Sequence, residues 1–369
     1  MILTGPIANY FRTHGPLPAR EFPAVIEKLR RGVALTTVEA HCAIRSLLSE
    51  SIADQFKADF LLALRRKGES AHEIATFALT LRELCVQPHI GPDDVGGILM
   101  DVCGSGGDQL HTFNISPAVA FVLAGAGVPV AKHGNRAVTS RCGSADVLEA
   151  LGIQIEMPPP TAARCLREVG ITFFFAPFYH RAFKNIAPVR QRLAAAGQAT
   201  VFNFLGPLLC PARPNVQLIG VPDPKLTRTL AEALQLMGAR RAIVASGQTE
   251  DGRGMDECST LGVTQLSEFD DGGGITDSTL DAEGLGLPRA SLAALAGGSR
   301  EDNAELIRRI LNGVESGPRR DIVLLNAAVA MRLAGRVANY SEGLKLAAQI
   351  VDSGGASDKL ERLAMASRG

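Results

Sequence analysis

The sequence predicts an α/β protein: a mostly parallel sheet covered by helices, with a small all-helical domain at its N-terminus. From Phe22 to Leu84, apolar residues recur at three- and four-residue spacing without a strand signal, which indicates roughly four packed helices. From Ile98 onward, short apolar runs alternate with helical patterns, as is typical of a parallel sheet with helices on both faces. We expect a helical domain over residues 1–95, with residues 183–210 packing on it, and an α/β domain over residues 96–369.

The composition excludes several classes of protein. Lys plus Arg and Asp plus Glu number 38 each, so no net charge attracts the chain to nucleic acid or to an anionic membrane. The seven cysteines are scattered and lack any CxxC spacing, which supports neither a disulfide framework nor a zinc site. There is no basic segment followed by an apolar run near the N-terminus, and no apolar stretch suited to a membrane span. We expect a cytoplasmic protein that binds neither nucleic acid nor membrane.

Two helix starts in the N-terminal domain have a specific signature. Thr36 with Glu39 and Ser70 with Glu73 fit the capping box, in which a hydroxyl and a carboxylate three residues apart satisfy each other's backbone amides. They predict helices that begin next to Thr36 and Ser70.

The α/β domain opens with a strand that runs into glycines. Ile98–Val102 is apolar and is followed by a loop from Gly104 to Asp108. Such a glycine-dense loop lets backbone amides approach an anion closely. Ser116 stands before Pro117 and an apolar run, so we expect Ser116 to cap a helix whose N-terminus favours phosphate.

The same arrangement occurs twice more before Gly152. A second strand, Val128–Ala131, leads into the basic turn Lys132–Arg136, and Ser144 is the expected cap of a helix over Ala145–Leu151. Taken singly, these features also fit a tight turn, a solvated basic turn and an ordinary cap. In open parallel sheets, however, ligands bind where strands end. Three such turns in succession favour a ligand with more than one phosphate group.

The rest of the chain continues the alternation. In the segment 178–215 the pattern allows only one strand, over Ala199–Phe202, and Gly206 with Pro207 suggests a hinge. The other predicted elements are strands over 171–175, 218–221, 240–246 and 263–266 and helices over 161–169, 224–237, 322–334 and 342–351.

An acidic pair follows the strand predicted over 240–246. Asp256 and Glu257 come after a glycine-rich loop. Adjacent carboxylates are usually only solvated, but Mg²⁺ is commonly held by one or two carboxylates together with substrate phosphates and water. Asp256 and Glu257 are therefore candidate magnesium ligands, with the Ser116 hydroxyl as a possible neutral ligand.

Several motifs together resemble the anthranilate phosphoribosyltransferase family, from about residue 23 to residue 350. They are GSGGD, TFNIS, AKHGNR, GSADVLEALG, APVR, FNFLGPL, GMDECS and VLLNAA. The resemblance implies a homodimer formed through the helical domain, in which each chain closes over phosphoribosyl pyrophosphate and Mg²⁺. It also implies an enzyme that transfers the phosphoribosyl group to the amine of anthranilate and releases pyrophosphate.

The resemblance carries roles onto individual residues. It gives catalytic roles to Lys132 and Arg190. Donor contacts fall on Gly104, Gly107, Asp108, Thr112, Asn114, Ser116, Pro117, Lys132, Ser140 and Ser144. Anthranilate contacts fall on Gly104, His133, Asn135, Pro177, His180 and Arg190. Metal contacts fall on Ser116, Asp256 and Glu257.

This chain also departs from the family pattern. Pro117 replaces a threonine, Gln109 a glycine, Arg181 a proline, and Ala199 an arginine in a slightly longer segment. These changes keep open a phosphoribosyltransferase with a different arylamine acceptor.

Two other functions remain as alternatives. A related nucleoside phosphorylase would lack the paired carboxylates of GMDECS. A non-enzymatic or nucleic-acid-binding homologue is disfavoured by the balanced charge and by the intact glycine loop, basic turn and acidic pair.

Overall fold

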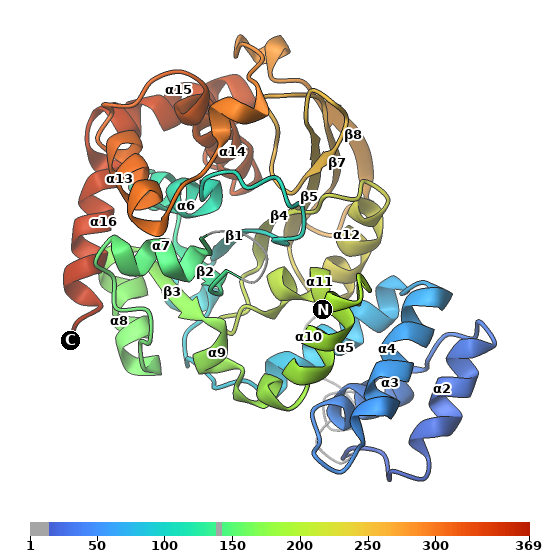
Figure 1. Ribbon diagram of the computed structural model, residues 1–369. Coiled ribbons are helices and arrows are strands. Elements are labelled where there is room, and N and C mark those ends of the chain that lie inside the picture. Colours follow the sequence, from blue (N-terminus) through green and yellow to red (C-terminus); the bar gives the residue numbers. More distant parts are fainter. Residues whose placement is uncertain (1–14, 138–141) are drawn as a thin grey trace.

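The computed structural model describes residues 15–137 and 142–369. It contains an N-terminal helical bundle beside a larger α/β domain, which confirms the predicted fold class (Figure 1). The bundle consists of α2 (Phe22–Arg30), α3 (Thr37–Leu47), α4 (Asp54–Lys67) and α5 (Ala71–Glu83). Both predicted capping boxes are present, at the starts of α3 and α5.

The sheet of the α/β domain is parallel in its centre. Its strands are β1 (Met100–Gly104), β2 (Val130–Gly134), β3 (Ile171–Phe175), β4 (Val216–Gly220), β5 (Arg241–Gln248), β6 (Gly254–Met255), β7 (Thr264–Asp270) and β8 (Thr276–Leu280). They lie in the order β3-β2-β1-β4-β5-β7-β8, with the short β6 paired to β5. The first five strands are mutually parallel, whereas β7 and β8 are antiparallel. The strand β8 was not predicted, because its exposed polar residues give no apolar alternation.

Helices cover both faces of the sheet, so adjacent strand residues enter different cores. On β4, Leu218 belongs to the core formed with α6 (Ile115–Gly125) and α14 (Pro318–Leu333), while Ile219 belongs to the core formed with α12 (Leu226–Leu236) and the helical bundle. Ile243 and Val244 divide in the same way on β5.

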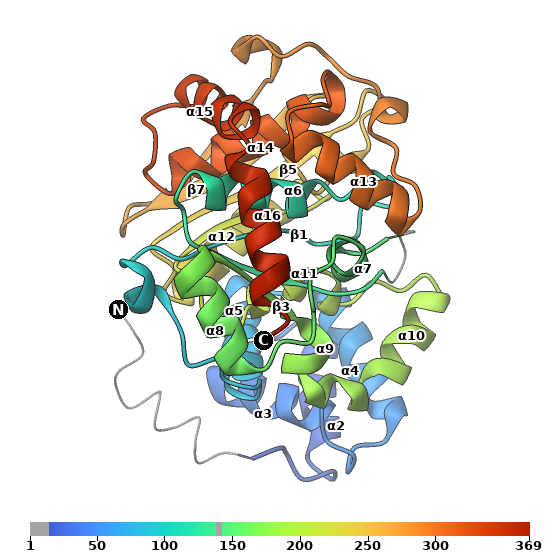
Figure 2. The same cartoon turned by 90° about the vertical axis from the view of Figure 1, so that its left-hand side faces the viewer.

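The remaining helices of the α/β domain enclose the α6 side and the β3 edge (Figure 2). They are α7 (Ser144–Ala150), α8 (Pro159–Val169), α13 (Arg300–Leu311), α15 (Tyr340–Asp352) and α16 (Gly355–Ala366). The sequence prediction missed α13 and α16. Among the described residues, no helix is long and apolar enough to cross a membrane.

The segment from residue 176 to residue 209 is helical and irregular. It contains α9 (Ala176–Tyr179), α10 (Ala187–Ala195) and α11 (Phe202–Leu205). The strand predicted over Ala199–Phe202 is therefore wrong. Phe202 and Leu205 are instead buried on a short helix against the bundle, and the Thr200 amide donates to Oδ1 of Asn203 at 2.8 Å.

Glu73 is a buried carboxylate of the helical bundle that accepts several hydrogen bonds. Its fully buried side chain accepts from the Leu35 amide at 2.9 Å, from Lys67 Nζ at 2.7 Å and from the Ser70 amide at 2.9 Å. Burial alone would raise the pKa of Glu73, but these hydrogen bonds lower it overall. Glu73 thus stabilises the fold at neutral pH, and this contribution is lost as the pH falls through its lowered native-state pKa.

We predict that Glu73→Ala lowers the free energy of unfolding by about 3–5 kcal/mol, because it leaves Lys67 buried without its partner. Glu39→Ala is the matched control: it removes a more exposed capping-box carboxylate and should cost only about 1 kcal/mol. Urea unfolding at pH 7 measures both values. Equal losses of unfolding free energy in the two variants would show that Glu73 contributes no more than an ordinary capping-box carboxylate.

Candidate active site

The topology places a crevice at the carboxyl ends of β1 and β4. The chain continues from β1 to β2 on one side, whereas β4 lies on the other side of β1. This reversal is the switch point at which open α/β sheets bind ligands. The glycine loop after β1 and the segment containing Asp256 and Glu257 meet there: the Asp256 carboxylate accepts hydrogen bonds from the Gly106 amide at 2.5 Å and from Ser105 Oγ at 3.2 Å.

Three glycines on neighbouring strands make this meeting possible. A Cβ atom on Gly104 would lie 2.8 Å from Oδ2 of Asp256, and one on Gly220 would overlap the Asp256 carbonyl oxygen. A Cβ atom on Gly247 would overlap the Glu257 carbonyl oxygen. Because these contacts are too short for any other residue, the glycines allow the acidic segment to cross the ends of β1, β4 and β5.

The crossing concentrates negative charge in a buried place. Asp256 is 7% exposed. Burial, followed by the charge of nearby Asp108, raises the pKa of Asp256 to about 8. Burial, followed by the charge of Asp256, also raises the pKa of Glu257. Burial and mutual repulsion therefore favour the protonated forms of both carboxylates, although the charge of Lys132 acts in the other direction on Glu257.

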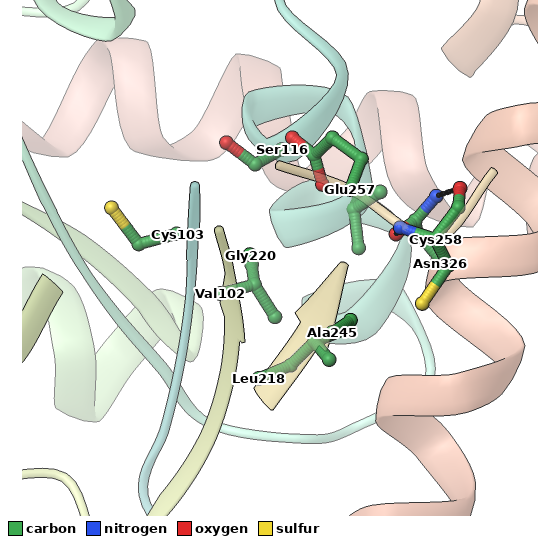
Figure 3. A pocket seen from close by; sticks show the side chains of 10 residues that line it. Val102, Cys103, Ser116, Leu218, Gly220, Ala245, Glu257, Cys258 and Asn326 are labelled. Atoms are coloured by element: carbon green, nitrogen blue, oxygen red, sulfur yellow. Dashed lines mark hydrogen bonds between the residues drawn. The ribbon is translucent and has the colours of Figure 1, made fainter. Parts of the chain in front are cut away.

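Lys132 is the buried cation beside them. It is 2% exposed, and its Nζ donates to the Val102 carbonyl at 2.9 Å and to Ser116 Oγ at 3.1 Å. Ser116 and Glu257 line the same small cavity of about 10 Å³, and Figure 3 shows their side chains next to each other.

The donor set fits a cation that shares its coordination with a ligand. Among the described residues, no group of three or more His, Cys, Asp and Glu side chains is arranged to hold a metal alone. Two carboxylates and a hydroxyl would instead suit Mg²⁺, which keeps several waters and binds substrate phosphates.

Strands β1 and β2 separate as they approach the site. Their only paired residues are Met100 and Val130, whereas β2 and β3 pair over five positions. Beyond that point side chains join the strands: Lys132 bonds the Val102 carbonyl, and the His133 amide donates to Oδ1 of Asp101 at 3.4 Å. The separation brings Lys132 and His133 to the site from one strand.

Both predicted helix caps are displaced, by two residues in α6 and by one residue in α7. Helix α6 begins at Ile115, so Asn114 rather than Ser116 is at the N-cap, and Pro117 is buried inside the helix. Helix α7 begins at Ser144, which leaves Gly143 at the N-cap. In both helices the predicted hydroxyl lies within the first turn instead of capping it.

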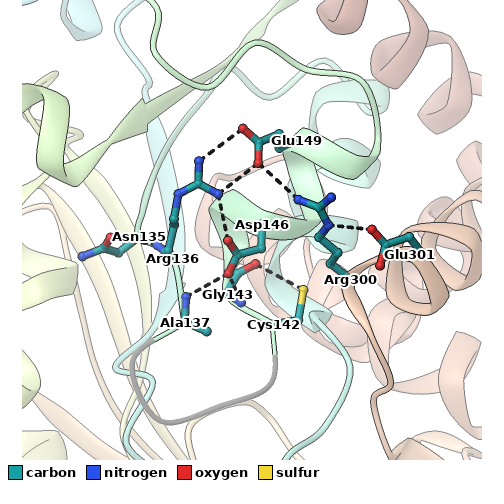
Figure 4. A network of polar contacts seen from close by, with 9 residues as sticks. All are labelled: Asn135, Arg136, Ala137, Cys142, Gly143, Asp146, Glu149, Arg300 and Glu301. Carbon is teal, nitrogen blue, oxygen red and sulfur yellow. Dashed lines mark hydrogen bonds and ion pairs between the residues drawn. The ribbon is translucent and has the colours of Figure 1, made fainter.

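Asp146 connects Ala137, just after the basic turn, with Gly143 at the N-cap of α7. Its Oδ2 accepts from the amides of Ala137 and Gly143, both at 2.9 Å. Arg136 donates to Asp146 and Glu149, and Figure 4 shows this network continuing to Arg300. Because Arg136 is neutralised there, Lys132 is the cation of the basic turn that faces the acidic pair. Ser140 lies outside the described residues.

The glycine loop has an unusual backbone. Gly106, Gln109 and His111 have φ values of 76°, 56° and 56°, a region that residues with a Cβ rarely adopt. Gln109 stands where the family has glycine. The backbone keeps a positive φ at this position, although glycine adopts that conformation more easily than glutamine does.

The other predicted donor residues surround this loop. Gly107 is exposed, and Oδ1 of Asp108 accepts from the Leu110 amide at 3.1 Å. Thr112 forms a β-bridge with Ala296. Asn114 Nδ2 donates to the Cys142 carbonyl at 3.0 Å, and its Oδ1 accepts from Asn303 Nδ2 at 3.0 Å. Both ends of its side-chain amide thus already have a partner within the protein.

Two histidines lie on the opposite side of Lys132 from the acidic pair. The rings of His133 and His180 are 5.3 Å apart, and they bond the carbonyl oxygens of Gly206 and Leu209. Burial lowers the pKa of both, that of His180 to about 4. Both rings are therefore neutral at pH 7.

Arg190 reaches the same region from α10. Its Cζ lies 4.9 Å from the centre of the Phe202 ring. Its guanidinium makes no ion pair or hydrogen bond with any residue in 15–137 or 142–369, and burial lowers its pKa. Asn135 and Pro177 are exposed just beyond β2 and β3. The structure thus brings the rings of His133 and His180 together, places Arg190 against Phe202, and leaves Asn135 and Pro177 exposed.

Sequence reasoning gave no role to Gly220, Gly247, Phe183 or Phe202. The two glycines could have been found, because Gly247 directly follows the strand predicted over 240–246 and Gly220 lies near the end of the strand predicted over 218–221. The two aromatic residues carry no comparable signal.

Family models match most of the chain. The glycosyl transferase family a/b domain matches residues 96–357, and the helical bundle domain of the same family matches residues 23–85.

Individual relatives agree over nearly the full length. An anthranilate phosphoribosyltransferase from Methanocorpusculum labreanum is 45% identical over 93% of this chain and 97% of its own. One from Moorella thermoacetica is 45% identical over 92% and 96%.

Solved structures agree as well. The enzyme from Thermus thermophilus has a TM-score of 0.84 at 40% identity, over 94% of this chain and 99% of its own. The Saccharomyces cerevisiae enzyme in complex with PRPP and Mg has a TM-score of 0.82 at 26% identity, over 95% and 99%. The switch-point crevice, the motifs around it and these relatives lead to one conclusion: the chain belongs to the anthranilate phosphoribosyltransferase family.

Proposed function

We propose that this enzyme transfers the phosphoribosyl group of phosphoribosyl pyrophosphate to the amine of anthranilate, releasing pyrophosphate in tryptophan biosynthesis. The observation that carries the proposal is the crossing of Asp256 and Glu257 over the ends of β1, β4 and β5. It places unneutralised carboxylates beside the glycine loop and Lys132, as a magnesium-bound polyphosphate ligand requires. Relatives named for this reaction, one of them solved with PRPP and Mg, support it.

The donor side is assigned to the β1 and β2 turns. We place phosphoribosyl pyrophosphate against Gly104, Gly107 and Asp108, and against the first turn of α6, where free amides favour phosphate. Lys132 is positioned to stabilise the charge that grows on the leaving pyrophosphate. Thr112, Asn114, Ser116, Pro117, Ser140 and Ser144 complete the proposed donor set.

Asp256, Glu257 and Ser116 would hold Mg²⁺ with the donor. The ion would offset the negative charge of the pyrophosphate as the bond to the sugar breaks. The chain's own contribution is to hold two carboxylates, whose pKa values burial has raised, where only a bound cation makes their ionised forms favourable.

The acceptor side is assigned to His133, His180 and Arg190, with Asn135 and Pro177 at its rim and Gly104 between the two halves. Arg190 lacks an acidic partner among the described residues, so it is free to bind the anthranilate carboxylate. The amine of anthranilate is already a neutral nucleophile, and the two histidines are neutral as well. Transfer then depends on orientation and charge stabilisation rather than on a general base.

The fluorescence of anthranilate provides the test of the activity. It should fall with time only when the enzyme, phosphoribosyl pyrophosphate and Mg²⁺ are all present. A donor-dependent release of pyrophosphate with another arylamine, but not with anthranilate, would instead support the alternative acceptor.

We also propose that residues 183–210 move with the helical domain 1–95, as one body that closes on residues 96–369. Contacts between the two segments support this division. Lys57 Nζ donates to the Asn185 carbonyl at 2.9 Å, Asn185 Nδ2 donates to the Leu48 carbonyl at 2.9 Å, and Arg82 Nε donates to the Leu208 carbonyl at 2.7 Å. Arg190 would approach the donor during such closure.

The proposed enzyme is cytoplasmic, binds no nucleic acid and forms a homodimer through the helical domain. Much of the bundle's apolar surface is covered by α10, α11 and α12 of the same chain, but Val33 and Phe56 are 46% and 39% exposed.

We predict that sedimentation at micromolar concentration shows a species of twice the 38.9 kDa chain mass. A single species at the chain mass would contradict a dimer.

Variants of Arg190 and Lys132 separate the two halves of the site. A charged hydrogen bond contributes roughly 1.5–3 kcal/mol, so Arg190→Ala should raise the KM for anthranilate about ten- to a hundredfold and leave donor affinity nearly unchanged. Lys132→Met keeps most of the buried volume and should weaken the donor instead. Calorimetry of donor binding and initial-rate kinetics measure both effects. Weaker donor binding in Arg190→Ala, with the KM for anthranilate unchanged, would move Arg190 to the phosphate side.

A further inference from the structure

We propose that Phe202 is a positioning residue for the acceptor: its ring holds the Arg190 guanidinium in place for the anthranilate carboxylate. This inference rests on the proposed function, because it deepens the role given there to Arg190. Phe202 lies in the FNFLGPL motif, to which neither the sequence nor the proposed reaction assigned a chemical role.

The geometry singles out the ring as the partner of the guanidinium. Arg190 Cζ lies 4.9 Å from the centre of the Phe202 ring, within the distance at which a cation is attracted to an aromatic face. In the described part of the chain the guanidinium has no hydrogen bond or ion pair. A face contact uses none of its five N–H donors, so the donors stay free for a carboxylate.

Phe202 also connects Arg190 to the histidines. The ring of Phe202 is 5.7 Å from that of Phe183, which is 5.6 Å from that of His180, which in turn is 5.3 Å from that of His133. This row of edge-to-face rings runs from the end of β2 to Phe202 on α11, which contacts Arg190 of α10. The position of Arg190 is therefore linked to that of His133 through packed rings.

Phe202 is also a core residue, 5% exposed within the apolar cluster of the bundle. A role in packing alone would lower stability without a selective effect on the acceptor. The two roles differ in one respect. If Phe202 positions Arg190, its effect on the acceptor requires Arg190 to be present, whereas an effect of packing alone does not.

A double-mutant cycle of Phe202→Leu and Arg190→Ala tests this difference. We expect Phe202→Leu alone to raise the KM for anthranilate about three- to thirtyfold, the range of a cation–ring contact, with donor affinity unchanged. In the Arg190→Ala background the same change should have almost no further effect on that KM. Phe202→Tyr, which keeps the ring face, should restore most of the acceptor affinity.

Phe60→Leu is the matched control. Phe60 is buried in the same cluster and stacks on Phe22 with ring centres 5.4 Å apart, so its loss should reduce stability and leave the KM for anthranilate unchanged. If Phe202→Leu does not fold, Phe202→Met, whose unbranched and flexible side chain fills irregular gaps in a core, takes its place in the cycle.

The possible results are distinct. Effects of Phe202→Leu and Arg190→Ala that simply multiply would overturn the positioning role of Phe202 and leave the acceptor role of Arg190 intact. An unchanged KM for anthranilate in Arg190→Ala itself would overturn both. A Phe60→Leu variant with the same rise in KM would show that the effect comes from loss of packing, which also overturns the inference.

Discussion

The site depends on the passage of one short backbone segment across three strand ends. Asp256 and Glu257 can lie there only because the contacts fall on glycines: Gly104 and Gly220 end β1 and β4, and Gly247 is the penultimate residue of β5. A Cβ atom at any of the three would come to 2.8 Å or closer to the crossing segment. The glycine loop binds Asp256 through the Gly106 amide, so the loop and the acidic segment are fixed relative to each other. Without this passage the sheet would still form, but its switch point would carry no concentrated charge.

This constraint explains the contrast between the two halves of the site. On one side, buried carboxylates have raised pKa values, and Lys132 is the cation directed toward them. On the other side, two neutral histidines belong to a row of aromatic rings that ends against Arg190, which has no acidic partner among residues 15–137 and 142–369. The first half suits a highly charged donor with a metal ion, and the second suits a flat aromatic molecule with one carboxylate. The separated ends of β1 and β2 bring the two halves together through the consecutive residues Lys132 and His133.

How far the sequence predicts this structure depends on whether the signal is local. The capping boxes at Thr36 and Ser70 and the strand over 171–175 were predicted correctly, because their patterns lie within a few residues. The same local reasoning misplaced the cap predicted at Ser116 by two residues and the cap predicted at Ser144 by one residue. This reasoning also predicted a strand over Ala199–Phe202, because a short apolar run does not show whether it packs in a sheet or in a helical core. Two features could not be predicted from residue spacing, because they depend on tertiary contacts. They are the ion pairs of Arg136 with Asp146 and Glu149 and the packing of the Phe202 ring against Arg190.

Calorimetry of donor binding across a Mg²⁺ titration tests the central claim, that the crossing segment assembles a cation site for the donor. The comparison is between the native enzyme and the double variant Asp256→Asn with Glu257→Gln, with circular dichroism to show that the variant is folded. The native enzyme should bind phosphoribosyl pyrophosphate more tightly as Mg²⁺ increases, and the folded double variant should lose that dependence together with turnover. A double variant that keeps both the Mg²⁺ dependence and turnover would contradict the claim.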